Sequence, residues 1–311
     1  RYKRKESSVE EALMEMYLAG VSVRRVEDIT QALWGVSVNA GTVSNLNQKM
    51  YERIEQWRNE PIDDKYVYVY LDGISLKRCW GGEVRNVSIL VAVGVNQDGF
   101  RDILGIAEGC KEDKQGWSGF LEYLKNRGLK CPELFISDKC MGLLESLDEY
   151  YPEALWQRCV VHYYRNVFSV VPRGKMKEAA AMLKAIHSQE DKQAARDKAE
   201  LVARKFEDMK LYKAAAKVRD FIDETLTYFD FPREHHRHIY TNNMLENGMR
   251  QIRRRTRVVG SFPDGKSTMM LAAARLRHIA GTKWGTRRYM NMDRLKEMRK
   301  EQSHQQAAVM G

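Results

Sequence analysis

The sequence has 311 residues, of which 43% are hydrophobic, and a formal net charge of +10. This length and apolar content predict a folded core in two or three domains. No apolar run approaches the roughly 18 residues that a membrane span needs, and the first residues lack a signal peptide's apolar stretch. Five cysteines without a Cys-x-x-Cys pair indicate reduced thiols. These features exclude membrane-spanning and disulfide-rich secreted proteins, so we expect a soluble cytoplasmic protein.

Residues 1–60 carry apolar residues at helical spacing, which predicts helices over 7–19, 22–34 and 41–57. A tight Gly-containing turn joins the last two. This arrangement suits a helix-turn-helix or a plain helical hairpin. In the first case the region binds DNA and supports multimerisation, and the polar residues offered to a groove are Asn39, Thr42, Asn45 and Lys49.

From Tyr66 the hydrophobic period changes to that of strands. An antiparallel meander is predicted over 66–71, 84–95 and 100–108, with a hairpin turn at 96–99. A helix at 115–127, a strand at 134–137, a helix at 141–150 and a strand at 154–160 follow. Three strands followed by alternating helix and strand is the order of an RNase H-like core. The next seventy residues have no strand signals and predict an all-helical insertion over 167–232.

Three acidic residues stand out by their positions. Asp72 ends the strand-like run 66–71, Asp138 ends the run 134–137, and Glu246 precedes the most basic stretch of the chain. Carboxylates at strand ends are costly in a packed sheet unless something cationic satisfies them. Two hard divalent ions would do so, and would also clamp the attacking and leaving oxygens of a phosphodiester exchange. Taken alone, Asp72 followed by Gly73 is better explained as a turn residue. We expect surface roles for Asp63, Asp64, Asp102 and Asp148.

Basic residues gather near the end of the chain. Between Arg233 and Arg288 there are 13 Lys and Arg against three acidic residues, a surplus equal to the net charge of the whole chain. Such a segment suits a polyanionic partner, and its alternative is a solvated basic face. The candidate DNA-binding residues here are Arg250, Arg253, Arg254, Arg255, Arg257, Lys283, Trp284, Arg287 and Arg288.

Several motifs in order give the sequence a family resemblance. They are Gly82–Gly99, Ile136–Asp138, Trp156–His162, Asn242–Glu246, Arg253–Pro263 and Trp284–Met290. Over about residues 60–292 the chain resembles the mutator-type transposases of bacterial insertion sequences. It differs from their pattern at Lys139-Cys140, where a small residue and His are more common, and at Asn243, where Pro is common.

The resemblance implies an RNase H-like fold with an α-helical insertion and a catalytic triad of Asp72, Asp138 and Glu246. It implies two Mg²⁺ ions on the triad, with Mn²⁺ as a substitute. The implied partners are double-stranded DNA, both element ends and target, and a second copy of the chain on paired ends. Cys159 and His162 match a Cys-x-x-His element that lies near the active site in the family. His162 is interpreted as a neighbour of DNA or the catalytic site, or as a buried hydrogen-bonded histidine.

The predicted fold is therefore α/β: an RNase H-like catalytic core with a mixed sheet, an all-helical insertion and a helix-turn-helix-like N-terminal region. The predicted domains are 1–60 (DNA binding and multimerisation), 61–166 (first part of the core), 167–232 (insertion), 233–300 (second part of the core, with the basic segment) and 301–311 (flexible tail). The predicted function is metal-dependent cleavage and strand transfer at the terminal inverted repeats of an insertion sequence, in a nucleoid-associated bacterial protein. The alternatives are a domesticated, inactive DNA-binding relative and a structure-specific nuclease.

Overall fold

The computed structural model describes residues 51–80, 83–109, 113–259 and 265–309, with the backbone alone at 76–80, 83–87, 247, 254–259, 265–268 and 305–309. The predicted helix-turn-helix therefore lies outside the described residues, together with Asn39, Thr42, Asn45 and Lys49. Residues 51–58 are helical and fall within the third helix predicted from the sequence.

Three antiparallel strands follow, because residues 66–109 are rich in the β-branched and aromatic side chains that pack well on a pleated surface. They are β1 (Tyr66–Trp80), β2 (Glu83–Asn96) and β3 (Arg101–Gly109). In the turn between β2 and β3, Gly99 has φ +86° and lies against the carbonyl oxygen of Met290, where a Cβ would clash. Only glycine suits both conditions. The meander and its turn are confirmed. The predicted end of the first strand is wrong: pairing with β2 carries β1 past Leu71 to Trp80, so Asp72 lies inside the strand, opposite Val91.

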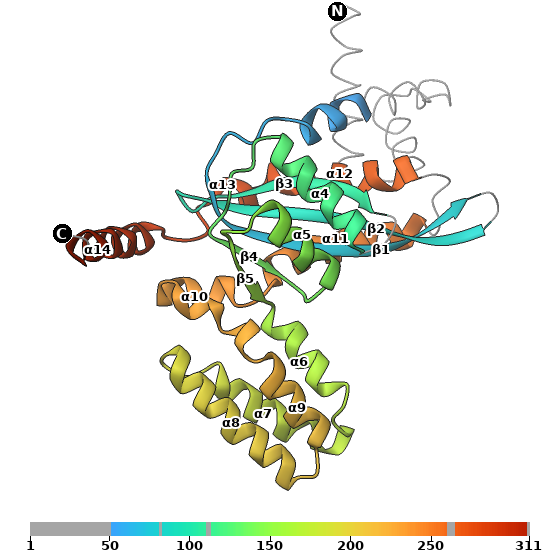
Figure 1. The fold of residues 1–311 in the computed structure, drawn as a ribbon. Helices are drawn as coiled ribbons and strands as arrows, with labels where there is room; N and C mark the ends of the chain where they lie inside the picture. Colours follow the sequence, from blue (N-terminus) through green and yellow to red (C-terminus); the bar gives the residue numbers. More distant parts are fainter. Residues whose placement is uncertain (1–50, 81–82, 110–112, 260–264, 310–311) are drawn as a thin grey trace, which may run out of the picture.

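Two short parallel strands complete a five-stranded mixed sheet. They are β4 (Leu134–Ser137) and β5 (Leu155–Arg158), and the strand order is β3-β2-β1-β4-β5. The helices packed on this sheet are α4 (Lys114–Asn126), α5 (Met141–Tyr150), α11 (Asn243–Val259) and α12 (Gly265–Ala280). Figure 1 shows α4 and α5 on one face of the sheet and α11 and α12 on the other.

Alternate residues of the central strands enter different cores, because successive side chains of a strand point to opposite faces. The residues of the core under α4 and α5 include Val69, Leu71 and Phe135. The residues of the core on the opposite face include Tyr68, Tyr70 and Ile136. That second core continues into the helices that follow β5.

The segment between β5 and α11 is helical, as its composition predicts. Its α-helices are α6 (Val160–Phe168), α7 (Met176–Ile186), α8 (Lys192–Asp208), α9 (Tyr212–Phe221) and α10 (Arg233–Ile239). Short 3-10 turns are η1 (Arg173–Lys175), η2 (Asp223–Thr225) and η3 (Thr227–Asp230). In Figure 1 helices α6 to α9 extend away from one edge of the sheet. We refer to residues 160–239 as the helical segment.

The last elements are α13 (Lys283–Thr286) and α14 (Asp293–Val309). Buried Leu295 anchors the first turn of α14, and the rest of the helix projects from the body (Figure 1). Residues 301–309, expected to be a flexible tail, are helical. Their Glu, Gln and Ala residues favour helix, and this preference extends α14 to Val309.

The architecture is thus mixed α/β, as predicted. Among the described residues, no helix combines the length and the apolar character needed to cross a membrane.

Candidate active site

Two of the candidate carboxylates are neighbours across the sheet. The parallel pairing of β1 with β4 sets Tyr68 opposite Leu134 and Tyr70 opposite Ile136, an offset of 66 residues. Asp72 and Asp138 are separated by the same 66 residues. Continuing the register by two residues therefore places them opposite one another, on strands that are typically about 4.8 Å apart.

Both aspartates also belong to the same face of the sheet. Asp72 is two residues after Tyr70, and Asp138 is two residues after Ile136, so each continues the face that carries the core with α11. Asp72 is half-buried and its Oδ1 accepts a hydrogen bond from the Gly73 N–H at 2.9 Å. Asp138 is exposed, and its Oδ1 accepts from the Lys139 N–H at 2.7 Å.

The third carboxylate, Glu246, reaches this edge through the start of α11. The residue before the helix, Asn242, is 1% exposed. Its Nδ2 donates to the Leu71 carbonyl oxygen at 3.0 Å, and its backbone N–H donates to Cys159 Sγ at 3.2 Å. Asn242 therefore fixes the start of α11 to the strand position next to Asp72. Glu246 follows in the first turn of the helix.

Each carboxylate has a partner within the protein. Arg165 of α6 donates from Nη2 to Glu246 Oε1 at 3.1 Å, and Glu246 is half-buried. Within the part of the chain that the structure describes, no group of three or more His, Cys, Asp or Glu side chains is close enough to hold a metal ion. Asp72, Asp138 and Glu246 therefore do not form an assembled metal cluster in this structure.

Cys159 and His162 lie between the aspartate edge and α11. Cys159 is 1% exposed, and burial raises the pKa of its thiol, an effect that the N–H bond from Asn242 opposes only in part. A thiol of this kind packs and accepts a hydrogen bond. His162 is half-buried, and its Nδ1 is a buried atom without a partner among the described residues.

Comparison with known proteins identifies the family. A sequence profile of the Transposase, Mutator family matches residues 1–284. The chain belongs to this Mutator family of transposases. The resemblance seen in the motifs is thereby confirmed.

Individual relatives of this Mutator-family chain carry insertion-sequence names. The transposase for insertion sequence element ISRM5 of Rhizobium meliloti is 36% identical over 301 residues, covering 96% of this chain and 75% of that protein. The transposase for IS256 in transposon Tn4001 of Staphylococcus aureus is 32% identical, covering 94% and 76%. The transposase for IS1081 of Mycobacterium tuberculosis is 33% identical, covering 96% and 72%. A transposase role is therefore supported for this chain.

The rival carboxylates of the Mutator-family chain lie elsewhere. Asp63, Asp64 and Asp148 are exposed, as expected. Asp102 is half-buried, which corrects its expected surface role. Its Oδ2 accepts from the Tyr66 hydroxyl at 3.1 Å, and burial raises its pKa. Because Asp102 is on β3, two strands away from β1, it is not a neighbour of Asp138.

The basic residues of α11 follow Glu246 along one side of the helix. Arg250 and Arg253 are four and seven residues after Glu246, a spacing that keeps side chains on one helical face. Both are exposed. Arg254, Arg255 and Arg257 lie on the same helix, and there the structure describes the backbone alone.

The second basic cluster is divided between surface and interior. Lys283 and Arg287 are exposed. Trp284 is half-buried: the guanidinium of Arg101 lies 4.5 Å from its ring centroid and donates to its carbonyl oxygen at 2.6 Å. Arg288, although exposed, donates from Nε to the Asp98 carbonyl oxygen at 3.0 Å. Trp284 and Arg288 thus hold the β2–β3 turn region against α13, a role that the sequence pattern did not indicate.

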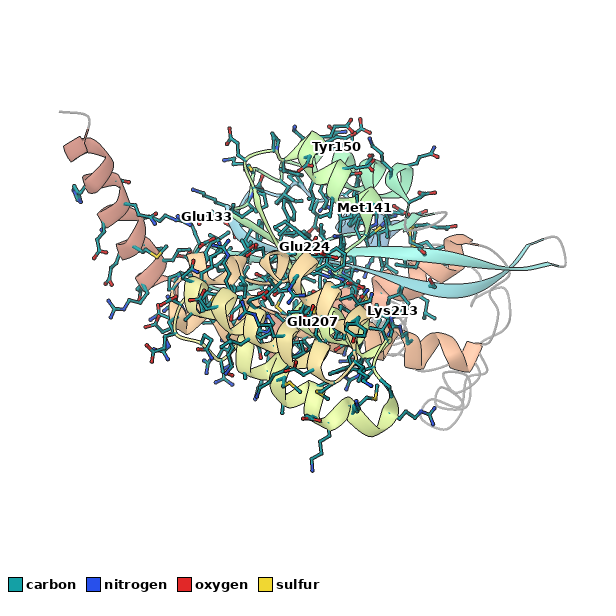
Figure 2. The ribbon with its side chains drawn as sticks, turned by 60° about the horizontal axis from the view of Figure 1, so that its bottom comes forward. Glu133, Met141, Tyr150, Glu207, Lys213 and Glu224 are labelled. Atoms are coloured by element: carbon teal, nitrogen blue, oxygen red, sulfur yellow. The ribbon has the colours of Figure 1, made fainter. Side chains whose placement is uncertain are left out.

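A group of charged residues next to Asp138 was also missed. Glu224 of η2 forms ion pairs with Lys139, which follows Asp138, and with Arg158 at 3.0 Å. The side chain of Arg158 is 4% exposed, so this pair is largely shielded from water. Figure 2 shows Glu224 where the helical segment meets the sheet. The only signal in the sequence was that Lys139 departs from the family pattern.

Proposed function

We propose that this chain is an Asp-Asp-Glu transposase that cuts and joins DNA strands at the ends of its own insertion sequence. The observation that supports the proposal is the parallel pairing of β1 with β4, whose register, if continued, sets Asp72 opposite Asp138. The contact between Asn242 and Leu71 also attaches the start of the helix that carries Glu246 to β1. Three carboxylates from two neighbouring strands and a helix are a typical donor set for divalent-ion phosphodiester chemistry.

The donors suit two magnesium ions, because carboxylate oxygens are the ligands that this hard cation prefers. Buried polar atoms near the edge also have unmet hydrogen bonds: Asn242 Oδ1 and His162 Nδ1 have no partner within the described residues. Such orphaned groups need a water, an ion or a substrate atom. When bound, the ions would supply an activated water or 3′-hydroxyl for in-line attack at phosphorus.

The chain's own residues would position the reactants. Arg165 orients the Glu246 carboxylate, and the exposed face of α11 with Arg250 and Arg253 offers phosphate contacts beside it. Contacts of this kind fix where the DNA backbone lies and do not read its sequence. We assign sequence recognition to the helix-turn-helix proposed for residues 1–60, and pairing of the two element ends to a homodimer.

The sheet order supports an RNase H-like core. An antiparallel meander β3-β2-β1 continues into parallel β4 and β5, and the helical segment follows β5 as an insertion before the helix that carries Glu246. On this reading, residues 61–166 and 233–300 form one catalytic core, and residues 167–232 are inserted within it.

The test is strand transfer in vitro with the DNA that flanks the gene. The protein is incubated with duplexes ending in the candidate terminal repeats and with a supercoiled target plasmid, in Mg²⁺ or in EDTA. We expect joined products in Mg²⁺ and none in EDTA. Duplexes of shuffled sequence should give many fewer joined products in Mg²⁺. Binding without any cleavage would indicate a domesticated relative. Cleavage of branched DNA without joining and without end preference would indicate a structure-specific nuclease.

A further inference from the structure

A pocket of ≈ 630 Å³ opens in the helical segment beside the candidate active site. Its walls come from α6, α7, η3, α10 and the residues that lead into α11. Thr241 and Asn243 line one end, and Asn243 is three residues before Glu246. The size falls within the range typical of small-ligand sites. A group bound in this pocket would therefore be adjacent to DNA held at the acidic edge.

Aromatic rings form one side of the pocket. Tyr228 and Phe229 are stacked with centroids 4.3 Å apart, and His236 meets them edge-on at 4.8 and 5.5 Å. Tyr228 is 3% exposed, whereas Phe229 and Tyr240 are partly exposed. The packed rings beneath hold the Phe229 ring in place, so that its accessible surface is a ready platform for another flat ring.

The histidines of the pocket are hydrogen-bonded within the protein and carry no charge near pH 7. Burial lowers the pKa of His187 to about 4, and its Nδ1 is 2.9 Å from the Tyr164 hydroxyl while its Nε2 is 2.9 Å from Thr225 Oγ1. Burial also lowers the pKa of His236. Both rings are therefore neutral near pH 7, and the interior of the pocket combines aromatic rings with neutral polar groups.

Positive charge sits at the rim. Lys184, Arg233 and Arg237 line the opening and are exposed. Within the described part of the chain, Lys184 and Arg233 have no side-chain hydrogen bond or ion pair, and no carboxylate lines the pocket. An aromatic, neutral interior with an unpaired cationic rim matches a ligand that has a flat ring and an anionic group, as a nucleotide does.

We propose that this pocket binds an unpaired nucleotide of the DNA that the active site holds, with its base against Phe229 and Tyr240 and its phosphate at Arg233 and Lys184. The proposal rests on the proposed function, since it takes DNA as the substrate. A paired base has both faces covered by its neighbours in the duplex, so only a base that has left the stack can use the ring surface of Phe229. The pocket therefore favours DNA whose strands are separated next to the cleavage position.

The test is fluorescence anisotropy with two labelled duplexes, one blunt and one with a short 3′ thymidine tail. Stacking on a single aromatic side chain changes affinity by about tenfold or more. We expect Phe229→Leu, which keeps an apolar side chain, to weaken binding of the tailed duplex about tenfold and to leave the blunt duplex unchanged. Arg233→Gln should act in the same direction. The matched controls are Tyr212→Leu and Lys213→Gln on α9, both at exposed positions outside the pocket lining, and they should bind both duplexes like the wild type.

Several outcomes separate this proposal from its alternatives. Equal losses for both duplexes would mean that the pocket residues contact phosphates alone, and no loss for either would remove nucleotides from the pocket. If the wild type binds thymidine monophosphate but shows no preference for the tailed duplex, the pocket takes free nucleotides and not DNA. Failure of the wild type to bind either duplex would instead contradict the proposed function.

A second measurement on the wild type avoids any folding defect of the variants. With 5-iodo-2′-deoxyuridine in the tail, ultraviolet irradiation joins the base to an aromatic ring that it stacks on. Mass spectrometry should find the adduct at Phe229, Tyr240 or His236. An adduct found only on residues outside the pocket would overturn the proposal.

Discussion

The two faces of the sheet draw on alternate residues of the same strands, yet they differ in kind. On the face under α4 and α5, the strand residues Val69, Leu71 and Phe135 meet an apolar core. On the face under α11, the same strands continue from Tyr70 into Asp72 and from Ile136 into Asp138. The first face is apolar at these positions, whereas the second carries two carboxylates that accept hydrogen bonds from the next backbone N–H groups, those of Gly73 and Lys139.

This difference shows that backbone pairing can position the two aspartates without a network of supporting side chains. Backbone pairing of β1 and β4 fixes the positions of the two aspartates relative to one another. The side chain of Leu71, which precedes Asp72 and points to the opposite face, therefore contributes only to core packing. Glu246 needs more, because a helix has to be attached to the sheet, and buried Asn242 makes that attachment. Both faces thus carry a buried core, and the face under α11 also carries the candidate site.

The largest expected effect comes from Asp72→Asn. This change keeps the shape of the side chain and removes the charge, so strand transfer in Mg²⁺ should fall by about a thousandfold or more, since charge stabilisation of several kcal/mol is lost. Affinity for DNA and the thermal unfolding midpoint should change little. Quantified joined product on gels measures the loss, and Asp148→Asn at an exposed site is the control. Strand transfer by Asp72→Asn at the wild-type rate would remove Asp72 from the site.

A substitution at Leu71, the residue before Asp72, tests the face of the sheet that packs under α4 and α5. Leu71 is fully buried under α4 and α5, and Leu71→Ala should lower the free energy of unfolding by about 3 kcal/mol. Activity per folded molecule should remain near that of the wild type, because the Leu71 carbonyl that binds Asn242 is retained. Denaturant titration followed by tryptophan fluorescence measures the free energy of unfolding, and the strand-transfer assay measures the activity. If Leu71→Ala is stable but inactive, the separation of the two faces is wrong.

Glu224→Gln tests the ion pairs where the helical segment meets the sheet beside Asp138. It leaves the guanidinium of Arg158, whose side chain is 4% exposed, without its counter-charge, and should cost about 2 kcal/mol of unfolding free energy. Strand transfer should also weaken, since Lys139 next to Asp138 loses the same partner. The control is Glu207→Gln, which breaks an exposed pair with Arg219 and should have little effect. Equal stability of the two variants would exclude a structural role for the Glu224 pairs.

How far the sequence predicts these features depends on how many residues separate the interacting groups along the chain. Strand β4 and helix α5 follow from local pattern, and their predicted limits match the structure. The position of Asp138 directly after β4 was also evident. Asp72 was expected to end a strand, but it lies inside β1 opposite Val91, because pairing with β2 carries β1 on to Trp80. The pairs of Glu224 were not, because Glu224 is 85 residues from Lys139 and no periodicity links them. Likewise, Trp284 was a candidate for DNA contact, and its stacking with Arg101, which is far away in the sequence, could not be read from the pattern.

The smallest expected effect concerns acid pH. The unfolded chain protonates His187 near pH 6.5, whereas burial lowers its pKa to about 4 in the folded protein. Between these values the unfolded state binds more protons, so stability is full above pH 6.5 and falls as the pH drops toward 4. Between pH 7 and 5 the wild type should lose about 2 kcal/mol more than His187→Gln does. Denaturant titrations of both proteins at the two pH values measure this, and parallel pH profiles would contradict it.

The most direct test of the central claim, that Asp72 and Asp138 bind the catalytic ions, is a change of metal preference. Thiolate is a poor ligand for Mg²⁺ and a better one for softer ions. Strand transfer by Asp72→Cys and by Asp138→Cys is measured in Mg²⁺ and in Mn²⁺, alongside the wild type and Asp148→Cys. The account predicts that both site variants are inactive in Mg²⁺ and regain activity in Mn²⁺, while Asp148→Cys follows the wild type in both. Site variants with the same ratio of Mn²⁺ to Mg²⁺ activity as the wild type would show that these carboxylates do not touch the metal.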